Sequence, residues 1–470
     1  MIYRLARFID TRTGQAPLVK KLLRYVFPDH WSFLLGEIAL YCFVVLVGTG
    51  IYLTFFFDPS MQHVIYNGPY TPLRGQQVSE AYRSVLDISF RYKAGLLIRQ
   101  THHWAADVFL VAITLHMLRV FFTGAFRKPR EITYYAGVLM LALAMFEGFA
   151  GYSLGDDLLS GMGLVIAYSV VLSIPFVGGN LALLIWHGPF PGTTEFFSRL
   201  YIAHVLLVPV AIGALLGIHL ITIAVTHHSQ FRGPRAREDN VVGVPMWPGY
   251  LFRTLGLALS VTAVLFLLGG LVQINPVWEW GPFHPELSTN GAQPDWYLGW
   301  LIGALRLMPG WEPHIGHYTL IPNAFWGGAF FPLLVFGFLL AWPLLERRFT
   351  RDHGYHHLLD RPRDAPWRTA IGVGFFTWVG MIFFAGSSDR VFVEMHIDYE
   401  SQIHVYQVLV FVVPFVAGWL AKRVCEQLRR SDAHPLRGAG GGLVRRTPTG
   451  GFEAVSDSTT TRTPEPTGRR

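Results

Sequence analysis

Two stretches of sequence decide the fold: LLIRQTHHWAADVFLVAITLHMLR (residues 96–119) and SRLYIAHVLLVPVAIGALLGIHLITI (residues 198–223). Each is mostly apolar and long enough to cross about 30 Å of hydrocarbon as a helix. Each also carries at least two histidines. Ionisable residues inside membrane helices are costly and usually functional. The two stretches therefore predict two membrane helices that share a functional site.

The composition of the whole chain is that of a membrane protein. Of its 470 residues, 51% are hydrophobic and 15% are charged. A soluble protein of this size carries about a quarter charged residues. Windows of 18 or more residues with almost no charge predict an all-α, polytopic fold with eight transmembrane helices. These windows lie at residues 34–57, 96–118, 132–154, 201–226, 251–274, 320–345, 368–386 and 403–424.

The net charge of +7 follows the membrane topology. Segments 1–30, 119–131, 228–253 and 346–368 contain 6, 4, 4 and 6 Lys and Arg, and the opposite segments 58–94, 152–199, 272–319 and 386–402 contain 4, 1, 1 and 1. By the positive-inside rule, this asymmetry predicts a multi-pass protein of the plasma membrane with both termini in the cytoplasm. Topology and anionic lipid thus explain the charge, and nucleic acid is not an expected partner.

The chain divides into five predicted regions. They are a basic amphipathic segment on the inner membrane surface (1–30), a four-helix bundle (31–230), a cytoplasmic linker (231–250), a second four-helix region (251–430) and a disordered cytoplasmic tail rich in Gly, Pro, Ser, Thr and Arg (431–470). The two cysteines, Cys42 and Cys425, predict no disulfide framework, and the absence of a CxxCH motif predicts no c-type heme on this chain.

Four histidines predict two heme sites between the two opening stretches. His102 and His116 are 14 residues apart, and His204 and His219 are 15 apart. Such spacings return to within roughly 40–60° of one helical face and separate the paired residues by about 21 Å. Because both helices should run in the same direction, His102 faces His204 and His116 faces His219. Two facing imidazoles at each of two depths suit two bis-histidine hemes that transfer electrons.

Two alternatives to heme ligation stay open at this point. The histidines can be ordinary buried polar residues, or they can carry protons in a transporter. Two matched pairs make both alternatives less favourable than heme ligation. His103 neighbours a ligand but points about 100° away from it. It has no partner at the right spacing and is left out of the predicted heme site.

Four glycines repeat the histidine spacing in the neighbouring helices. Gly36 and Gly50 are 14 residues apart, and so are Gly137 and Gly151. Glycine lets another surface approach the backbone closely. Close packing between helices is the alternative explanation, because small residues are common where membrane helices meet. The repeated spacing favours flat heme macrocycles lying against the backbone.

Two arginines are placed to bind heme propionates. Arg99 precedes His102 by three residues, and Arg119 follows His116 by three. Each guanidinium would then pair with a propionate at one membrane face. For Arg119, a simple anchor at the inner membrane face is the alternative.

These features together resemble cytochrome b of the bc family, over about residues 31–425. The resemblance rests on the histidines, the glycine pairs, LSIPFVGG at 172–179 and QPDWY at 293–297. Pro294-Asp295-Trp296-Tyr297 is similar to the family's Pro-Glu-Trp-Tyr motif. With GYSLGDDLLSG at 151–161 and eight spans in one chain, the sequence looks most like the actinobacterial type. Leu34 occupies the place where photosynthetic relatives attach an extra heme through cysteine, so only two hemes are expected.

The resemblance implies a quinol:cytochrome c oxidoreductase with two quinone pockets. At the outer pocket, one electron from quinol goes to a Rieske iron–sulfur subunit, and the other goes to the outer heme on His102 and His204. That electron crosses to the inner heme on His116 and His219 and reduces quinone near the cytoplasm, with proton translocation. Moving an electron inward against about 100 mV costs about 2.3 kcal/mol. The inner heme is therefore expected to have the higher reduction potential.

Specific residues are implied at both pockets. Asp295 is the expected proton acceptor of the outer pocket, with Tyr297 as its hydrogen-bonding partner, although Asp295 can also be the N-cap of the following helix. His228 and Arg253 are candidates for the inner pocket. Thr254 occupies the position where relatives have an acidic residue.

The expected partners also come from the resemblance. They are a Rieske subunit, a cytochrome c subunit, a second copy of the complex, a heme-copper oxidase and membrane lipids, with menaquinol as the substrate. A diheme membrane anchor of a dehydrogenase or hydrogenase is the nearest alternative function. A transporter is the alternative of a different class.

Overall fold

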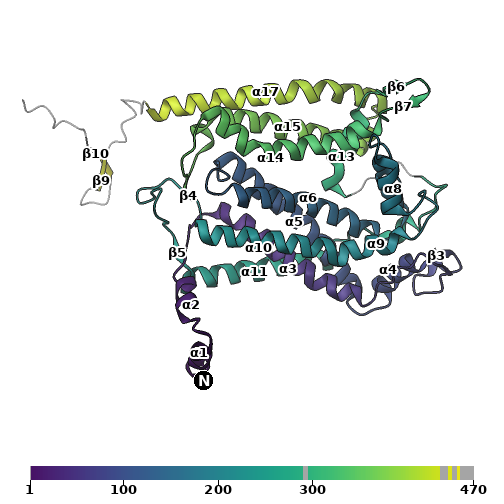
Figure 1. The fold of residues 1–470 in the computed structure, drawn as a ribbon, viewed down its shortest axis with the longest axis horizontal. Helices are drawn as coiled ribbons and strands as arrows, with labels where there is room; N and C mark the ends of the chain where they lie inside the picture. Colours follow the sequence, from purple (N-terminus) through teal and green to yellow (C-terminus); the bar gives the residue numbers. More distant parts are fainter. Residues whose placement is uncertain (1, 289–294, 434–442, 447–451, 456–470) are drawn as a thin grey trace, which may run out of the picture.

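The computed structural model describes residues 2–288, 295–433, 443–446 and 452–455, and these residues are mostly helical (Figure 1). Eight helical segments in this part of the chain are long and apolar enough to cross a membrane, which confirms the predicted number. They are α3 (Leu34–Thr54), α5 (Gly95–Thr123), α6 (Glu131–Ser153), α9 (Phe196–Ile202) continuing through η3 (Ala203–Leu207) into α10 (Val208–Thr226), η4 (Met246–Tyr250) with α11 (Leu251–Leu271), η6 (Trp326–Phe330) with α14 (Phe331–Thr350), α15 (Pro366–Ser387) and α17 (Tyr399–Ala433).

Shorter elements connect these spans. The helices are α1 (Ile2–Thr13), α2 (Ala16–Leu23), η1 (Trp31–Phe33), η2 (Thr71–Leu73), α4 (Glu80–Phe90), α7 (Leu158–Leu172), α8 (Gly178–Trp186), α12 (Val277–Trp280), η5 (Trp296–Leu298), α13 (Gly299–Leu307), η7 (Pro362–Asp364) and α16 (Asp389–Glu394). The strand pairs are β1 (Val26–Phe27) with β5 (Val244–Pro245), β2 (His63–Ile65) with β3 (Gln77–Ser79), β4 (Gln230–Phe231) with β8 (Leu358–Leu359), β6 (His314–Ile315) with β7 (Tyr318–Thr319), and β9 (Leu443–Arg446) with β10 (Phe452–Val455).

The spans lie side by side and share one large core. Helix α5 packs against α3 and α11, α6 packs against α10, and α15 packs against α17 (Figure 1). The main hydrophobic cluster contains Cys42 of α3, Phe121 of α5, Leu265 of α11 and Trp342 of α14. The first and second predicted four-helix regions are therefore in direct contact. Their boundary at residues 231–250 remains a prediction.

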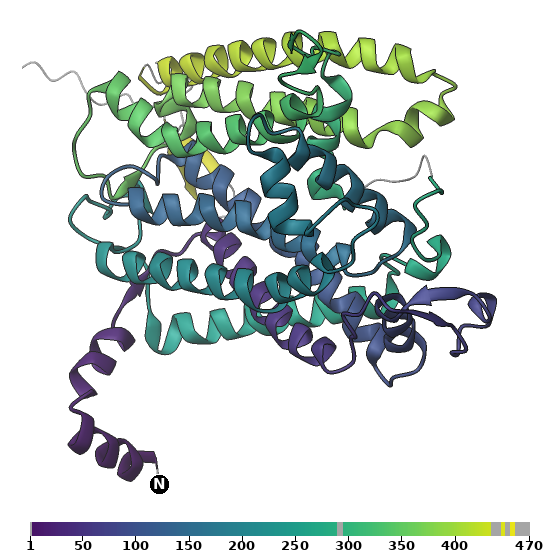
Figure 2. The same ribbon diagram turned by 45° about the vertical axis from the view of Figure 1, so that its right-hand side comes forward.

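The long connections gather at one end of the bundle. Helices α4, α7, α8 and α12 lie there, together with the strands β2 and β3, as the turned view also shows (Figure 2). Helix α7 is an apolar helix of 15 residues. Asp157 caps its first turn, since the Asp157 carboxylate accepts from the Leu159 backbone N–H. This end of the molecule is called the loop end below.

Both ends of the described helical chain lie at the opposite end of the bundle. Helices α1 and α2 project from it, and α17 finishes there (Figure 1). None of the residues of α2 is buried. Residues 434–442, 447–451 and 456–470 of the predicted disordered tail lie outside the described residues. In the described part of that region, α17 continues to Ala433 and β9 pairs locally with β10, and the disorder of the tail remains a prediction.

Candidate functional site

The first pair of predicted ligands lies near the loop end, between α5 and the η3 turn. The imidazole centroids of His102 and His204 are 6.2 Å apart, with the rings at 80°. Two metal–nitrogen bonds of about 2 Å each, plus the two ring radii, give about 6 Å between centroids. The His102–His204 pair therefore has the spacing for one iron between the rings.

The second pair has the same geometry at the other depth. The centroids of His116 and His219 are 6.3 Å apart, with the rings at 65°. All four rings thus pair as the spacing of the sequence predicts, His102 with His204 and His116 with His219. Both pairs fit a bis-histidine heme, in which the iron has no open coordination position.

A π-helical turn accounts for the unequal spacing of the two histidine pairs. Residues 203–207, which include His204, form the π-helix η3 within the fourth span. A π turn takes in one more residue than an α turn and is frequent at functional sites. His204 and His219 are 15 residues apart, one more than His102 and His116, and the wider π turn accommodates this additional residue. Both histidines of the fourth span can therefore face α5.

The predicted glycines lie against the histidines themselves. A Cβ on Gly151 would lie 2.5 Å from His204 Cε1, and one on Gly36 would lie 3.1 Å from His116 Cε1. Gly50 and Gly137 face His102 and His219 in the same way, at 3.4 and 3.7 Å. The missing side chains thus provide room for the imidazole rings. Direct contact of these backbones with a macrocycle remains a prediction.

Hydrogen bonds at Nδ1 orient three of the four rings. His102 Nδ1 donates to Thr49 Oγ1 at 2.9 Å, and His219 Nδ1 donates to the Thr133 carbonyl oxygen at 2.9 Å. His204 Nδ1 donates to the Glu147 carbonyl oxygen at 3.2 Å. A proton on Nδ1 leaves Nε2 free as the metal ligand. The donor set is therefore that of neutral imidazoles prepared to hold iron.

The two predicted propionate-binding arginines have different surroundings. Arg99 Nη2 donates to the Asn275 carbonyl oxygen at 2.6 Å. The Arg119 guanidinium lies 4.1 Å from the Phe33 ring centroid, and its buried Nε and Nη2 have no hydrogen-bond partner among the described residues. A buried cation without a partner is unfavourable unless an anion binds it. This orphaned guanidinium fits a heme propionate.

One cavity joins the His102–His204 pair to the predicted outer pocket. Apolar side chains of α3, α5, α6 and α10 form most of its wall, and a few polar groups converge on it. Such mixed cavities are typical of small-molecule sites. The polar lining includes Arg99, His103, Glu147, Tyr152, Asn275, Asp295 and Tyr297.

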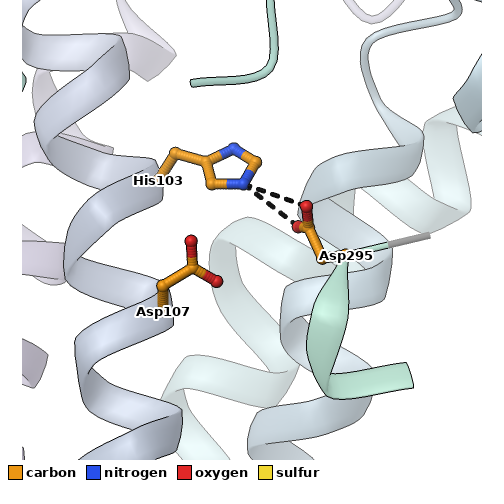
Figure 3. A group of neighbouring side chains, drawn as sticks. All are labelled: His103, Asp107 and Asp295. Carbon is orange, nitrogen blue, oxygen red and sulfur yellow. Dashed lines mark hydrogen bonds and ion pairs between the residues drawn. The ribbon is translucent and has the colours of Figure 1, made fainter. Parts of the chain in front are cut away.

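Asp295 is held at the cavity by a histidine that the sequence analysis left out. His103 Nε2 lies 3.2 and 3.1 Å from the two Asp295 carboxylate oxygens (Figure 3). Tyr297 Oη donates to Asp295 Oδ2 at 3.5 Å, as predicted. The nearby Asp107 accepts from Trp296 Nε1 at 2.9 Å. Because Asp295 lies 192 residues beyond His103, no local spacing could have revealed their contact.

The alternative role of Asp295 as a helix cap is wrong for its side chain. Asp295 does occupy the N-cap position of η5, but its carboxylate makes no capping hydrogen bond. The carboxylate instead points toward His103 (Figure 3). Pro294, the first residue of the predicted motif, lies outside the described residues. Burial, followed by the charge of Asp295, raises the pKa of Tyr297, so its hydroxyl remains a donor at physiological pH.

Two aspartates of the GYSLGDDLLSG stretch are buried beside the cavity. Ser79 Oγ donates to Asp156 Oδ2 at 2.5 Å, and this contact ties the β3 strand to the turn before α7. Burial raises the pKa of Asp156 to about 7, and the adjacent Asp157 contributes to the rise. Asp156 also has a φ of +48°, which aspartate and asparagine tolerate better than most residues.

The Asp156 carboxyl predicts a pH-dependent stability of the loop end. Because its folded pKa lies above the unfolded value, its stabilising contribution is present below about pH 4 and is lost as the pH rises through about 7. The expected loss is about 4 kcal/mol at most. Asp156→Asn keeps the shape without the charge, so it should raise the thermal midpoint in detergent at pH 8 and change it little at pH 5.

The matched control for this prediction is the exposed Asp239. Asp239→Asn should leave the thermal midpoint unchanged at both pH values, since its carboxylate is already in water. A lower midpoint for Asp156→Asn at pH 8 would contradict the expectation. Heating rates must be equal, because membrane proteins unfold irreversibly and their midpoints depend on the rate.

The residues predicted for the inner pocket do not form one cluster. His228 is packed against Phe27 at 5.1 Å between centroids, and burial lowers its pKa to about 4, so its imidazole is neutral. Arg253 pairs with Asp29 at 2.8 Å, and both side chains are largely exposed. A second cavity, at the end of the bundle opposite the loop end, is lined by Asp29 and Phe33. The Phe33 ring is in contact with Arg119.

An unpredicted carboxylate lies beside Thr254. Thr254 Oγ1 donates to Glu37 Oε2 at 2.5 Å, and Tyr250 Oη also donates to Glu37. Helix α3 therefore supplies an acidic group next to Thr254, where the resemblance implied an acidic residue on the fifth span. The signal in the sequence was a glutamate within the first apolar window, which is rare enough to indicate function.

The chain is similar to several known proteins. Residues 107–282 match the family described as cytochrome b (N-terminal)/b6/petB. The cytochrome bc1 complex cytochrome b subunit of Streptomyces coelicolor is 45% identical over 460 residues, which are 97% of this chain and 83% of the relative. The same subunit of Mycobacterium tuberculosis is 46% identical over 454 residues, 96% of this chain and 82% of the relative.

A solved structure supports the fold as well. A chain described as hyperthermophilic respiratory Complex III superposes with a TM-score of 0.67 at 20% sequence identity. The match covers 89% of this chain and 98% of that one. At this low identity the likeness concerns the arrangement of the helices.

Proposed function

The chain belongs to the cytochrome b subunits of the cytochrome bc1 complex, the core of a quinol:cytochrome c oxidoreductase, and on that premise we propose how its residues work. The observation that carries the proposal is the pair of facing histidines at each of two levels, 6.2 and 6.3 Å between centroids. His102 and His204 hold one b-type heme, and His116 and His219 hold the other. When bound, each heme supplies an iron that takes up and releases one electron.

Quinol is oxidised in the cavity between His204 and Asp295. Its oxidation releases two electrons and two protons. Asp295 accepts the two protons in turn from the quinol hydroxyls, and His103, at 3.1 Å, stabilises each proton and can pass it on before the next is taken up. Tyr297 orients the carboxylate. The cavity wall is otherwise apolar, which favours binding of a quinol ring and keeps bulk water away.

The two electrons of quinol take different routes: one leaves this chain, and the other crosses the membrane within it. The first reduces a Rieske iron–sulfur subunit docked at the loop end, and a cytochrome c subunit receives electrons from there. The second passes from the His102–His204 level to the His116–His219 level, about 21 Å along α5. Two such electrons, from two quinol oxidations, and two protons taken up near the cytoplasm reduce one quinone to quinol near His228, where Arg253 and Glu37 are candidates for binding and proton delivery. With both termini cytoplasmic, this arrangement translocates protons outward.

The remaining assignments are proposed on the family resemblance. They are menaquinol as the substrate, a homodimeric complex, and association with a heme-copper oxidase. Arg99 and Arg119 bind propionates. Helices α1 and α2 lie on the inner membrane surface. Both carry basic residues, and no residue of α2 is buried.

Isolation of the intact complex tests this proposal. We expect two b-type hemes per chain in the reduced spectrum, copurifying Rieske and cytochrome c subunits, and quinol-dependent reduction of cytochrome c. A chain without b-type absorption would contradict every cytochrome assignment and favour a transporter. Two hemes without the Rieske and cytochrome c subunits would instead favour a membrane anchor of a dehydrogenase.

A further inference from the structure

His204 differs from the other three predicted ligands in its environment at Nδ1. His102 Nδ1 contacts a hydroxyl, His219 Nδ1 contacts a backbone carbonyl, and His116 Nδ1 has no partner among the described residues. His204 Nδ1 lies 3.0 Å from Glu147 Oε1, in addition to the Glu147 carbonyl oxygen at 3.2 Å. Within the described chain, a carboxylate thus reaches only one of the four rings.

Glu147 is placed there by α6, within the third membrane span and six residues before its end at Ser153. Only 18% of its side chain is exposed, and its Oε2 is buried without a hydrogen-bond partner. Burying a carboxylate within a membrane protein is costly, so such a residue usually serves a function. The His204 imidazole contributes an N–H toward the carboxylate, and the described residues offer Oε2 no further donor.

The two histidine levels consequently differ in nearby charge. Glu147 brings a carboxylate to the His102–His204 level. Each level has an arginine three residues from a histidine, Arg99 at His102 and Arg119 at His116, so the Glu147 carboxylate is the charge that distinguishes the two levels. A negative charge beside an axial imidazole makes the ligand more electron-donating and favours the oxidised iron, whereas a nearby cation favours the reduced one.

We propose that Glu147 tunes the His102–His204 site to the lower reduction potential of the two. The inference rests on the proposed function, because it assumes a heme at each level. It gives a structural origin for the direction of electron flow. One electron leaves the His102–His204 level, which is oxidised, and enters the His116–His219 level, which is reduced. No bond is formed or broken in this transfer.

Glu147 is a positioning and tuning residue in this role. Its carbonyl oxygen fixes the Nδ1 proton of His204, and its carboxylate sets the charge beside the ring. Replacement by glutamine keeps the backbone contact, the side-chain length and an oxygen acceptor, but removes the charge. The substitution therefore separates the effect of charge from that of ring orientation.

Redox titration of the purified complex tests the proposal through the b-type absorbance. In Glu147→Gln we expect the midpoint potential of one heme to rise by a tenfold shift in its reduction equilibrium, 59 mV for one electron. The other midpoint should not move. In a His116→Leu background, where only the His102–His204 heme remains, the same rise is expected.

Two control variants separate charge from other effects. Thr49→Val removes a neutral hydrogen bond to His102 at the same level and should shift the midpoint less than Glu147→Gln. Glu37→Gln removes another intramembrane carboxylate, one bonded to Thr254 rather than to a histidine. It should leave the His102–His204 midpoint unchanged. If Glu147→Gln does not retain heme, Glu147→Asp keeps the charge and should raise the midpoint by less than 59 mV.

The possible results separate a failure of the tuning role from a failure of the proposed function. Unchanged or lowered midpoints in Glu147→Gln, with both hemes present, would overturn the tuning role and leave the proposed function standing. The same holds if Glu147→Asp, as the only variant that retains heme, leaves the midpoint unchanged or lowers it. A wild-type complex without two b hemes would overturn the proposed function itself.

Discussion

Replacing His102 by leucine should halve the b-type heme content of the purified complex and abolish quinol:cytochrome c reductase activity. His102 and His204 are the facing rings at one level, 6.2 Å apart. Leucine has no lone pair for the iron and leaves His204 as a single ligand. The remaining heme, between His116 and His219, should keep its absorbance. The measurement is a reduced-minus-oxidised spectrum with heme extraction, normalised to protein.

The neighbouring histidine provides a matched control for this experiment. His103→Leu removes the same kind of side chain one position along α5, but His103 faces Asp295 rather than an iron site. This variant should retain both hemes and lose activity. His116→Leu should remove the other heme. Equal heme loss in the His102 and His103 variants would contradict the assignment of ligands.

The ligands could be predicted because helical geometry alone relates them. Residues 14 apart on a membrane helix share a face, so His102 and His116 predicted two ligand positions at different depths of one span. The second pair was predicted with an angular mismatch, since 15 positions overshoot the face. The π turn at residues 203–207 absorbs the mismatch. No residue type in that turn specifies a π-helix, so the sequence could not reveal it.

The glycines show where a correct pattern received an incomplete interpretation. Their spacing correctly indicated a close approach to the backbone. It did not say which group approaches, and the structure places the His204 ring where a Gly151 Cβ would be, at 2.5 Å. Periodicity places a residue on a face. The identity of its neighbour depends on the rotation and tilt of two helices, which packing determines.

The polar partners of the sites were missed because they depend on tertiary contacts. Asp295 contacts His103 of α5 although the two residues are 192 positions apart in the sequence. Glu147 reaches His204 from a neighbouring span, and Glu37 reaches Thr254 in the same way. A search for every Asp and Glu inside the apolar windows would have found Glu37, Asp107 and Glu147 as candidates. It would not have identified their partners.

Replacing Asp295 by asparagine should lower kcat for quinol oxidation by about 100-fold or more, within the usual range for loss of a general base. Asparagine has nearly the same shape and can still accept a hydrogen bond from His103. It cannot take up a proton from quinol. Both hemes and their midpoint potentials should be unchanged, since Asp295 contacts none of the four ligands. Steady-state reduction of cytochrome c by quinol measures the effect.

Comparison of three variants shows why the proton acceptor is assigned to Asp295. Tyr297→Phe removes a long contact of 3.5 Å, so its effect on kcat should be small, within about tenfold. Asp107→Asn removes a second carboxylate of the same cluster, whose observed bond is to Trp296 Nε1, and should also have the smaller effect. A loss in Asp107→Asn equal to that in Asp295→Asn would instead make the two carboxylates a shared acceptor. Full activity of Asp295→Asn would place the acceptor elsewhere in the cavity, where Glu147 is the remaining carboxylate of its lining.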